Sequence, residues 1–319
     1  MKNIALVGLG GVGGYFGYQL LKTKKEEDKT RISFVARGLT YKVIKENGLT
    51  LLSPGTDTTS LDPDSLYEDV KLLTGVDLFI LCVKEYDLEN LCNQLKELVT
   101  EETLLLPLMN GVDIYERIRK IIDNGTVLPS CVYVASHIKT PGVIEHKGQP
   151  GKIFIGRDPR VKNPIPLPLI HLLQTTGLDA TFMEDASQTI WMKFLFIAPF
   201  GLVTARYNVS IGTVLQDTEL KQQATAIMSE ILMIAQKKNI PLPQNAIEET
   251  LLKAASFPFE ATTSLQLDVR ERKQNNELQL FAGAILNYSK ELNLEAGATN
   301  SLYKQLLQLT QSSAQNPAG

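Results

Sequence analysis

The sequence contains little cysteine, histidine or tryptophan: 3, 3 and 1 in 319 residues. Cys82, Cys92 and Cys131 form neither an even set nor a Cys-x-x-Cys pair, so we expect no disulfide framework and a reducing, cytoplasmic compartment. The three histidines have no metal-ligand spacing to one another or to the cysteines. We therefore expect no metal site.

An excess of charge of one sign and long apolar runs are also missing. There are 32 Lys and Arg against 35 Asp and Glu, a net charge of −3, so a nucleic-acid partner is not expected. The longest uncharged apolar stretch, 194–205, is shorter than the roughly 20 residues that cross a bilayer and is interpreted as a buried helix. The N-terminal residues do not resemble an export signal, and we expect no membrane partner.

What the sequence does have is a regular alternation of elements in its first part. Short apolar runs typical of buried strands are found at 3–9, 31–36, 77–83, 103–108, 127–136, 152–156 and 180–183. Helical spacing is found between them at 15–25, 88–98, 113–122 and 167–176. The alternation predicts an α/β domain over residues 1–185, with a mostly parallel sheet covered by helices on both faces.

Beyond residue 185 few β-rich runs remain. Apolar residues instead recur every three or four positions, as in amphipathic helices. The pattern predicts an all-α second domain over residues 186–319, whose surface could support a homodimer.

A glycine-rich segment follows the first apolar run and precedes a helix. It fits G-x-G-x-x-G, with the glycines placed to turn off a strand and to let a pyrophosphate approach the backbone and the helix N-terminus. Its residues, which we expect to bind a dinucleotide, are Gly8, Leu9, Gly10, Gly11, Val12 and Gly13.

The second apolar run indicates which dinucleotide binds. An NAD site places an acid near the end of this strand, but here the strand ends in Arg37-Gly38 with no acid. A guanidinium there suits a 2′-phosphate, so the sequence favours NADPH over NADH. The alternative is an Arg37 that only caps a surface loop.

Three further polar residues stand at positions where a ligand is expected. Lys84 and Asn110 each follow an apolar strand, and ligands bind outside the carboxyl ends of such strands; the alternatives are a surface lysine and an Asn-Gly turn. Lys193 lies in a segment that is apolar on nearly every helical face. Either it extends to the surface, or its ammonium faces a cleft and donates to an oxygen that gains negative charge.

In these residues the chain resembles the ketopantoate reductase (2-dehydropantoate 2-reductase) family, over essentially its whole length. The resemblance implies an N-terminal Rossmann-type domain that binds NADPH, and a helical domain, with the site in the cleft between them. Its residues, in chain order, are Gly8, Gly10, Gly13, Arg37-Gly38, Val83-Lys84, Asn110-Gly111-Val112, His146 to Gly148, Ile155-Gly156, Trp191 to Lys193, Ser264 to Asp268, and Glu277.

The resemblance also implies roles for individual residues. Lys193 protonates the ketone oxygen and Glu277 helps to hold the substrate. Asn110 contacts cofactor and substrate, Lys84 and Arg37 bind the cofactor, and Ser264 lies near the substrate carboxylate. One extra residue between Asp268 and Glu277 leaves the alignment of that acid open.

The chain departs from the family at two positions. The family commonly has asparagines four and eight residues after the catalytic lysine, where this chain has Ile197 and Gly201. An unpaired buried polar group of the substrate costs about 1–3 kcal/mol, so substrate recognition must differ here.

The sequence thus predicts an NADPH-dependent reductase that converts ketopantoate to pantoate in pantothenate and coenzyme A biosynthesis. Two alternatives are a reductase of a different small 2-oxo acid, favoured by Ile197 and Gly201, and a non-catalytic regulator that responds to NADPH. Lys193 and Glu277 count against the regulator, because a pure sensor needs neither.

Overall fold

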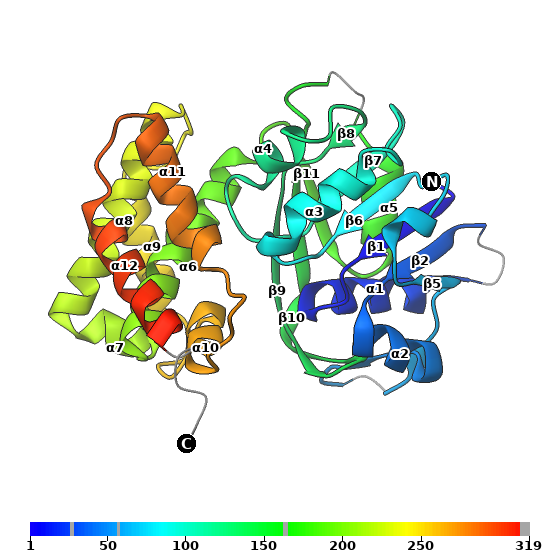
Figure 1. Ribbon diagram of the computed structural model, residues 1–319, viewed down its shortest axis with the longest axis horizontal. Coiled ribbons are helices and arrows are strands. Elements are labelled where there is room, and N and C mark those ends of the chain that lie inside the picture. Colours follow the sequence, from blue (N-terminus) through cyan, green and yellow to red (C-terminus); the bar gives the residue numbers. More distant parts are fainter. Residues whose placement is uncertain (26–28, 56–57, 162–164, 313–319) are drawn as a thin grey trace. The chain divides into compact units, whose positions relative to one another are not determined.

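The computed structural model describes residues 1–25, 29–55, 58–161 and 165–312. The chain divides into two compact units, Met1–Ala186 and Ser187–Gly319 (Figure 1). This division falls one residue beyond the boundary expected from the sequence.

The first unit contains a six-stranded sheet in the order β5-β2-β1-β6-β7-β8, with every neighbouring pair parallel. The strands are short and mostly apolar, as expected for strands covered on both faces. Strand order reverses beside β1, which has β2 on one side and β6 on the other, so a crevice is expected at this point. The strands are β1 (Asn3–Val7), β2 (Arg31–Val35), β5 (Ser65–Tyr67), β6 (Leu78–Leu81), β7 (Leu104–Pro107) and β8 (Thr126–Val127).

Helices connect these strands and complete the predicted α/β arrangement. The predicted fold class, a mostly parallel sheet in an α/β unit followed by helices, is confirmed. The connecting helices are α1 (Gly11–Thr23), α2 (Gly38–Asn47), the 3-10 turn η1 (Val70–Leu72), α3 (Glu85–Leu95) and α4 (Ile114–Arg119).

The first unit also contains a second sheet of five strands, which the sequence pattern does not distinguish from the first. Its order is β11-β10-β3-β4, and β9 pairs antiparallel with β10. The predicted strand at 127–136 therefore divides between the two sheets, and the one at 152–156 is only the end of a long strand. The elements are β3 (Leu49–Leu52), β4 (Ser60–Leu61), β9 (Ser130–Thr140), β10 (Val143–Gly156), α5 (Leu167–Thr175) and β11 (Asp179–Met183).

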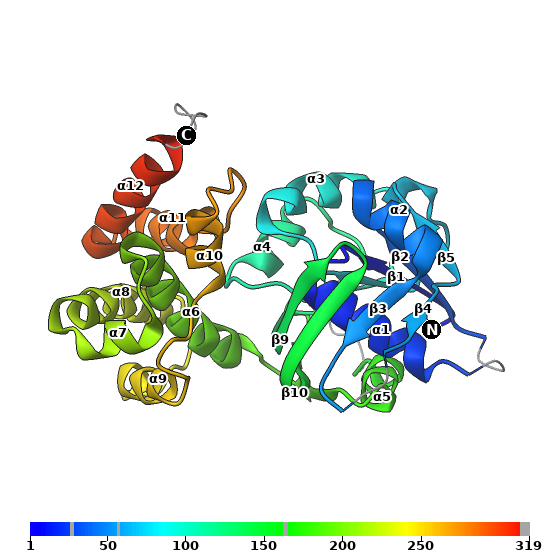
Figure 2. The same ribbon diagram turned by 90° about the horizontal axis from the view of Figure 1, so that it is seen from below.

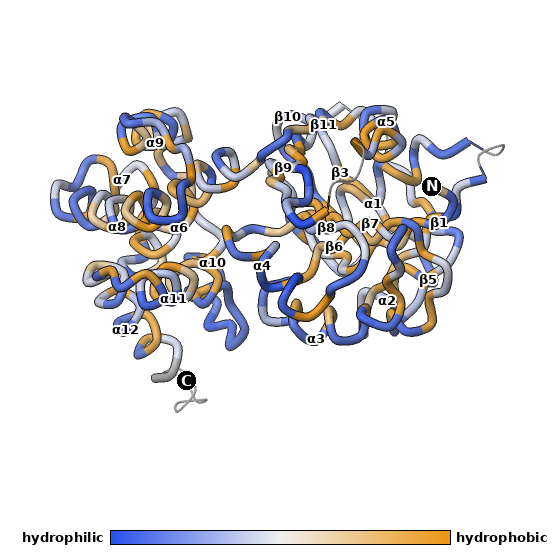
Figure 3. The backbone as a smooth tube through the Cα atoms, turned by 90° about the horizontal axis from the view of Figure 1, so that it is seen from above, coloured by the Kyte–Doolittle hydropathy of each residue, from blue (hydrophilic) through white to orange (hydrophobic). Residues whose placement is uncertain are grey.

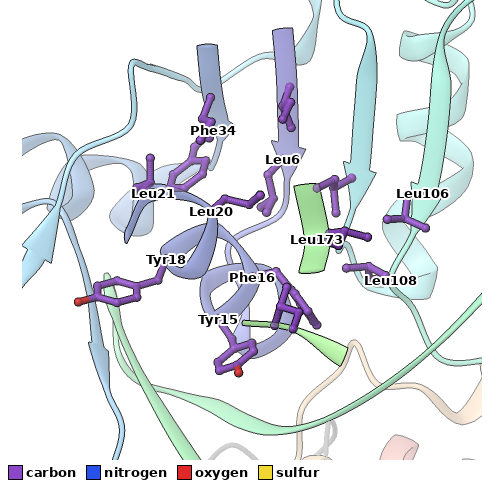
Figure 4. Close-up of a cluster of buried hydrophobic side chains, with 14 of the residues drawn as sticks. Leu6, Tyr15, Phe16, Tyr18, Leu20, Leu21, Phe34, Leu106, Leu108 and Leu173 are labelled. Carbon is purple, nitrogen blue, oxygen red and sulfur yellow. The ribbon is translucent and has the colours of Figure 1, made fainter. Parts of the chain in front are cut away.

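Helix α1 contributes to the core between the two sheets (Figures 2 and 4). Its Phe16 and Leu20 are buried together with Leu6 of β1 and Phe34 of β2, and Leu173 of α5 belongs to the same cluster. Burial of a large apolar side chain stabilises the fold by about 1.5–3 kcal/mol. The start of α1 is therefore held firmly in place.

His146, one of the residues of the family resemblance, joins the β9–β10 hairpin to α1. Its ring packs on Tyr15 with centroids 4.6 Å apart. Its Nδ1 lies 2.9 Å from Oγ of Ser53, and its Nε2 lies 3.0 Å from the carbonyl oxygen of Gln149. Since Tyr15 Oη in turn accepts from the amide of Gly151 at 2.9 Å, these contacts are structural.

A buried ion pair fixes the loop between α4 and β8. The side chains of Arg119 and Asp158 are 1% and 0% exposed. Arg119 also donates to the main-chain carbonyls of residues 122–125, and Asp158 accepts from Tyr115 Oη at 2.7 Å and from the amide of Val127 at 2.8 Å. The charges are therefore compensated by hydrogen bonds as well as by each other.

The second unit consists of helices that pack around α6. By length and composition α6 could cross a bilayer, but 61% of its most apolar window is buried inside the fold. Figure 3 shows that hydrophobic and hydrophilic stretches alternate along the helices of this unit. The predicted buried helix at 194–205 is part of α6. The elements are α6 (Ser187–Tyr207), α7 (Ile211–Gln216), α8 (Thr218–Lys237), α9 (Ala246–Ala255), α10 (Ser264–Arg270), the π-helix η2 (Gln279–Gly283), α11 (Ala284–Glu291) and α12 (Gly297–Ser312).

Candidate functional site: a dinucleotide pocket and a lysine-bearing helix

The turn between β1 and α1 has a geometry that only glycine accepts at two positions. Gly8 has φ +94°, and its amide donates to the carbonyl of Val35 at 3.0 Å. A Cβ at Gly13 would lie 1.9 Å from the carbonyl oxygen of Gly8. The first and third glycines of the motif are therefore required by the protein's own packing.

Gly10 is different, because nothing in the protein excludes a side chain there. A Cβ at this position would meet no atom within 4 Å. Gly10 is the N-cap of α1 and no side chain caps the helix, so its first amides point toward this open space. Such an arrangement fits a phosphate group that approaches the backbone closely.

A cavity of about 620 Å3 opens at the carboxyl ends of β1 and β2 beside this turn. Its size is within the range of cofactor sites. Of the predicted binding residues it brings together Gly8, Leu9, Gly10 and Arg37. The predicted residues that do not line it are Gly11, Val12, Gly13, Lys84 and Asn110.

The wall of this cavity carries charges of both signs. Arg37 is the N-cap of α2, and its Nη2 lies 2.9 Å from Oδ2 of Asp87 in the first turn of α3. Lys71 also lines the cavity, as do Glu68 and Asp69. Lys71 and Asp87 are not among the residues predicted from the sequence; for Asp87, the available signal was its position three residues after Lys84.

Lys84 and Asn110 have the locations that their strand-end positions predict. Lys84 is the exposed N-cap of α3, and Asn110 is half-buried after β7, next to Gly111 with φ +116°. Their predicted contacts with cofactor or substrate stay predictions.

In the second unit, Lys193 is half-buried on α6. The helix is held nearby by Trp191, which is buried and stacks on Tyr288 with ring centroids 5.9 Å apart. Ile197 and Gly201 follow Lys193 at intervals of four residues and so share its helix face.

Phe281 of η2 occupies the space next to Gly201. A Cβ at position 201 would lie 3.4 Å from the ring of Phe281, which also contacts Phe194 with centroids 6.5 Å apart. The amide of Phe281 donates to the carbonyl of Glu277 at 3.2 Å, and Glu277 is 5% exposed. Thus Lys193 lies on α6, and the buried Glu277 lies in the turn that leads into η2, which packs on α6.

The other predicted substrate residue has a different setting. Ser264 is exposed and begins α10, directly after the helix cap Thr263. Asp268, one turn on, is paired with Lys273 at 2.8 Å. Its carboxylate is thus engaged within the protein.

Among the residues that the structure describes, no group of three or more His, Cys, Asp or Glu side chains is arranged to hold a metal ion.

Comparison with known proteins agrees with this geometry. Residues 4–160 match the model of ketopantoate reductase PanE/ApbA, and residues 185–310 match that of its C-terminal region. The uncharacterized oxidoreductase YkpB of Bacillus subtilis is 24% identical over 302 residues, which cover 94% of this chain and 96% of that protein.

Two solved structures have the same fold over nearly their whole length. The PanE/ApbA family ketopantoate reductase from Ralstonia eutropha has a TM-score of 0.87, with 20% identity over 98% of this chain and 99% of that one. D-mandelate dehydrogenase, solved with NADH and anilino(oxo)acetate, has a TM-score of 0.84, with 20% identity over 97% and 99%. From the two family matches and the glycine turn that they include, it follows that the chain belongs to the ketopantoate reductase PanE/ApbA family of nicotinamide-dependent oxidoreductases.

Proposed function

We propose that the chain catalyses the NADPH-dependent reduction of a small 2-oxo acid, with 2-dehydropantoate (ketopantoate) as substrate and pantoate as product. The observation that carries this proposal is Lys193, a half-buried cation on a largely apolar helix, together with the buried Glu277 in the turn before the neighbouring η2. Related proteins of Nostoc and Pyrococcus horikoshii, 23% and 24% identical, are 2-dehydropantoate 2-reductases.

The first unit would hold the cofactor through the groups already described. The amides after Gly10 would bind its diphosphate, and Arg37 would pair with the 2′-phosphate that distinguishes NADPH from NADH. Lys84 and Asn110, at the ends of β6 and β7, are the further predicted contacts. When bound, the reduced nicotinamide supplies a hydride to the ketone carbon.

Lys193 supplies the proton that completes the reduction. As the carbonyl carbon gains the hydride, its oxygen gains negative charge, which the ammonium of Lys193 stabilises and then neutralises by donating a proton. The product is a secondary alcohol and the lysine is left neutral until it regains a proton from water. Glu277 accepts a hydrogen bond from the substrate hydroxyl, and Ser264 donates a hydrogen bond to the substrate carboxylate.

A different 2-oxo acid is the second candidate, and a specific observation favours it. Ile197, half-buried one turn after Lys193, puts an alkyl group on this face of α6, and Gly201 farther along is buried against Phe281 and offers no polar group. An alkyl group beside the substrate suits an alkyl or aryl substituent better than a hydroxyl. D-mandelate dehydrogenase shows that this fold occurs in an enzyme named for another acid.

NADPH oxidation, followed by its absorbance, tests both candidates. The purified chain is offered ketopantoate and a panel of 2-oxo acids that are shorter, unbranched or aryl-substituted. Turnover of ketopantoate with the highest kcat/KM supports the first candidate, and a preference for an apolar acid supports the second. Cofactor binding without turnover of any acid would contradict both.

Lys193→Ala gives the matched test of the mechanism, with Lys237→Ala as control. Lys237 is an exposed lysine of α8 in the same unit. The proposal requires that turnover be lost in the first variant and kept in the second.

A further inference from the structure

Arg37 contacts an acid in the wall of the dinucleotide pocket, Asp87. Their side chains form an ion pair of 2.9 Å, with 63% of Arg37 and 31% of Asp87 exposed. They come from different elements, since Arg37 follows β2 and Asp87 lies in the first turn of α3. Both line the cavity beside the glycine turn.

This ion pair matters because a guanidinium recognises a phosphate through two parallel N–H donors. A carboxylate that already accepts from Nη2 of Arg37 competes for those donors. It also places a negative charge near the dianionic 2′-phosphate of NADPH. The 2′-hydroxyl of NADH, in contrast, is uncharged and can donate a hydrogen bond to a carboxylate.

The other acids of the pocket are less suited to this role. Asp69 accepts from the amide of Lys71 at 2.9 Å and so caps η1. Glu68 and Asp69 are exposed, whereas Asp87 is half-buried and contacts the arginine directly. Asp87 is thus the acid whose charge is coupled to Arg37.

We propose that Asp87 is a specificity-determining residue of the dinucleotide site: by pairing with Arg37 it limits the preference for NADPH, so that the site binds both NADPH and NADH. The inference rests on the proposed function, because it assumes that Arg37 meets the adenosine ribose. It adds Asp87, with a charge opposite to that of Arg37, to the groups that recognise the 2′ substituent of the ribose.

The test is a titration of the full chain, purified free of cofactor, with NADPH, NADH, 2′,5′-ADP and 5′-ADP. Asp87→Asn keeps the size of the side chain and removes its charge. A unit charge at about 5 Å from a dianion changes affinity on the order of tenfold in water-like surroundings. We therefore expect NADPH and 2′,5′-ADP to bind about tenfold more tightly, and NADH and 5′-ADP to change by less than about twofold.

Glu89→Gln is the matched control, since Glu89 is an exposed acid of the same helix that does not line the pocket. It should leave the ratio of the NADPH and NADH affinities unchanged. In an Arg37→Ala background the competition for the guanidinium is gone and the direct repulsion remains, so the part of the Asp87→Asn effect that survives there measures the repulsion alone.

Three results would overturn the inference: an affinity ratio unchanged by Asp87→Asn, an equal gain for NADH, or an equal effect of Glu89→Gln. If the parent chain reduces a 2-oxo acid but shows one of these, only the role of Asp87 is wrong. If the parent chain binds neither dinucleotide, the proposed function falls together with it.

Discussion

Gly13 stands so close to Gly8 that a Cβ on the former would lie 1.9 Å from the carbonyl oxygen of the latter. Gly10, between them, has open space where a side chain would point. Gly13 is therefore required by the packing of the fold, whereas we expect Gly10 to be required by a bound ligand. Substitution of each by alanine should separate the two effects.

Gly13→Ala should destabilise the first unit by about 3 kcal/mol or more, because the helix start must move away from the turn. Gly10→Ala should leave thermal unfolding nearly unchanged and weaken dinucleotide binding at least about tenfold, since the methyl group takes the space of the diphosphate. Thermal unfolding and NADPH titration of both variants measure this. An unchanged affinity in Gly10→Ala would exclude the diphosphate from this turn.

Arg37→Ala should weaken NADPH binding by about 10- to 100-fold, the value of paired hydrogen bonds to a charged group. NADH should change by less than about threefold because it lacks the 2′-phosphate. Titration of both cofactors checks the difference. An equal loss for both would mean that another group contacts the 2′ position.

Lys193→Ala should lower kcat by about 100- to 10,000-fold, the usual contribution of a general acid. The affinity for NADPH should stay within about twofold, because the glycine turn and Arg37 belong to the other unit. Steady-state kinetics and titration of one preparation give both numbers. Turnover near that of the parent chain would remove Lys193 from the mechanism.

The buried pair of Arg119 and Asp158 should dominate the stability of its region. Asp158→Asn leaves a buried guanidinium without its counter-charge, which costs about 3–5 kcal/mol. Asp179→Asn, in the exposed pair with Lys152, should cost no more than about 1 kcal/mol. Denaturant unfolding compares them, and similar losses would contradict the distinction between buried and exposed pairs.

Asp77 gives the fold an acid-sensitive contact. Burial by itself raises the pKa of this carboxyl, but hydrogen bonds from the amides of Lys2 and Asn3 outweigh it, so the pKa lies below the ordinary 3.8. A carboxyl with a lowered folded-state pKa stabilises the fold above its unfolded pKa, and this stability is lost as pH falls through 3.8 and below. The unfolding free energy of Asp77→Asn should therefore depend less on pH in this range, as acid titration of both proteins would show.

The sequence predicted well wherever a local pattern decides the structure. Gly8 and Gly13 stand in a motif whose spacing is dictated by a tight turn, and strands such as β6 (Leu78–Leu81) are continuous apolar runs. The second sheet was not separated because the outer part of the β9–β10 hairpin is polar and exposed, so that no apolar run marks it.

Local sequence patterns could not predict the contacts between side chains within the site. An acid in the first turn of a helix is common, since it suits the helix dipole, and nothing local shows that Asp87 meets Arg37, fifty positions earlier. In the same way, Gly201 was visible as a departure from the family, but its neighbour Phe281 follows only from the packing of α6 on η2. Pairs distant in sequence need the fold to bring them together.

The ring of Phe281 against Gly201 also constrains the order in which substitutions can accumulate. An asparagine at 201 is longer than the methyl group that just fits there, so it would overpack against the ring at a cost of about 1–3 kcal/mol. Shortening residue 281 first would instead open a void among the helices and cost about 3–5 kcal/mol. In either order, a laboratory lineage selected for the amide would pass through a less stable ancestor.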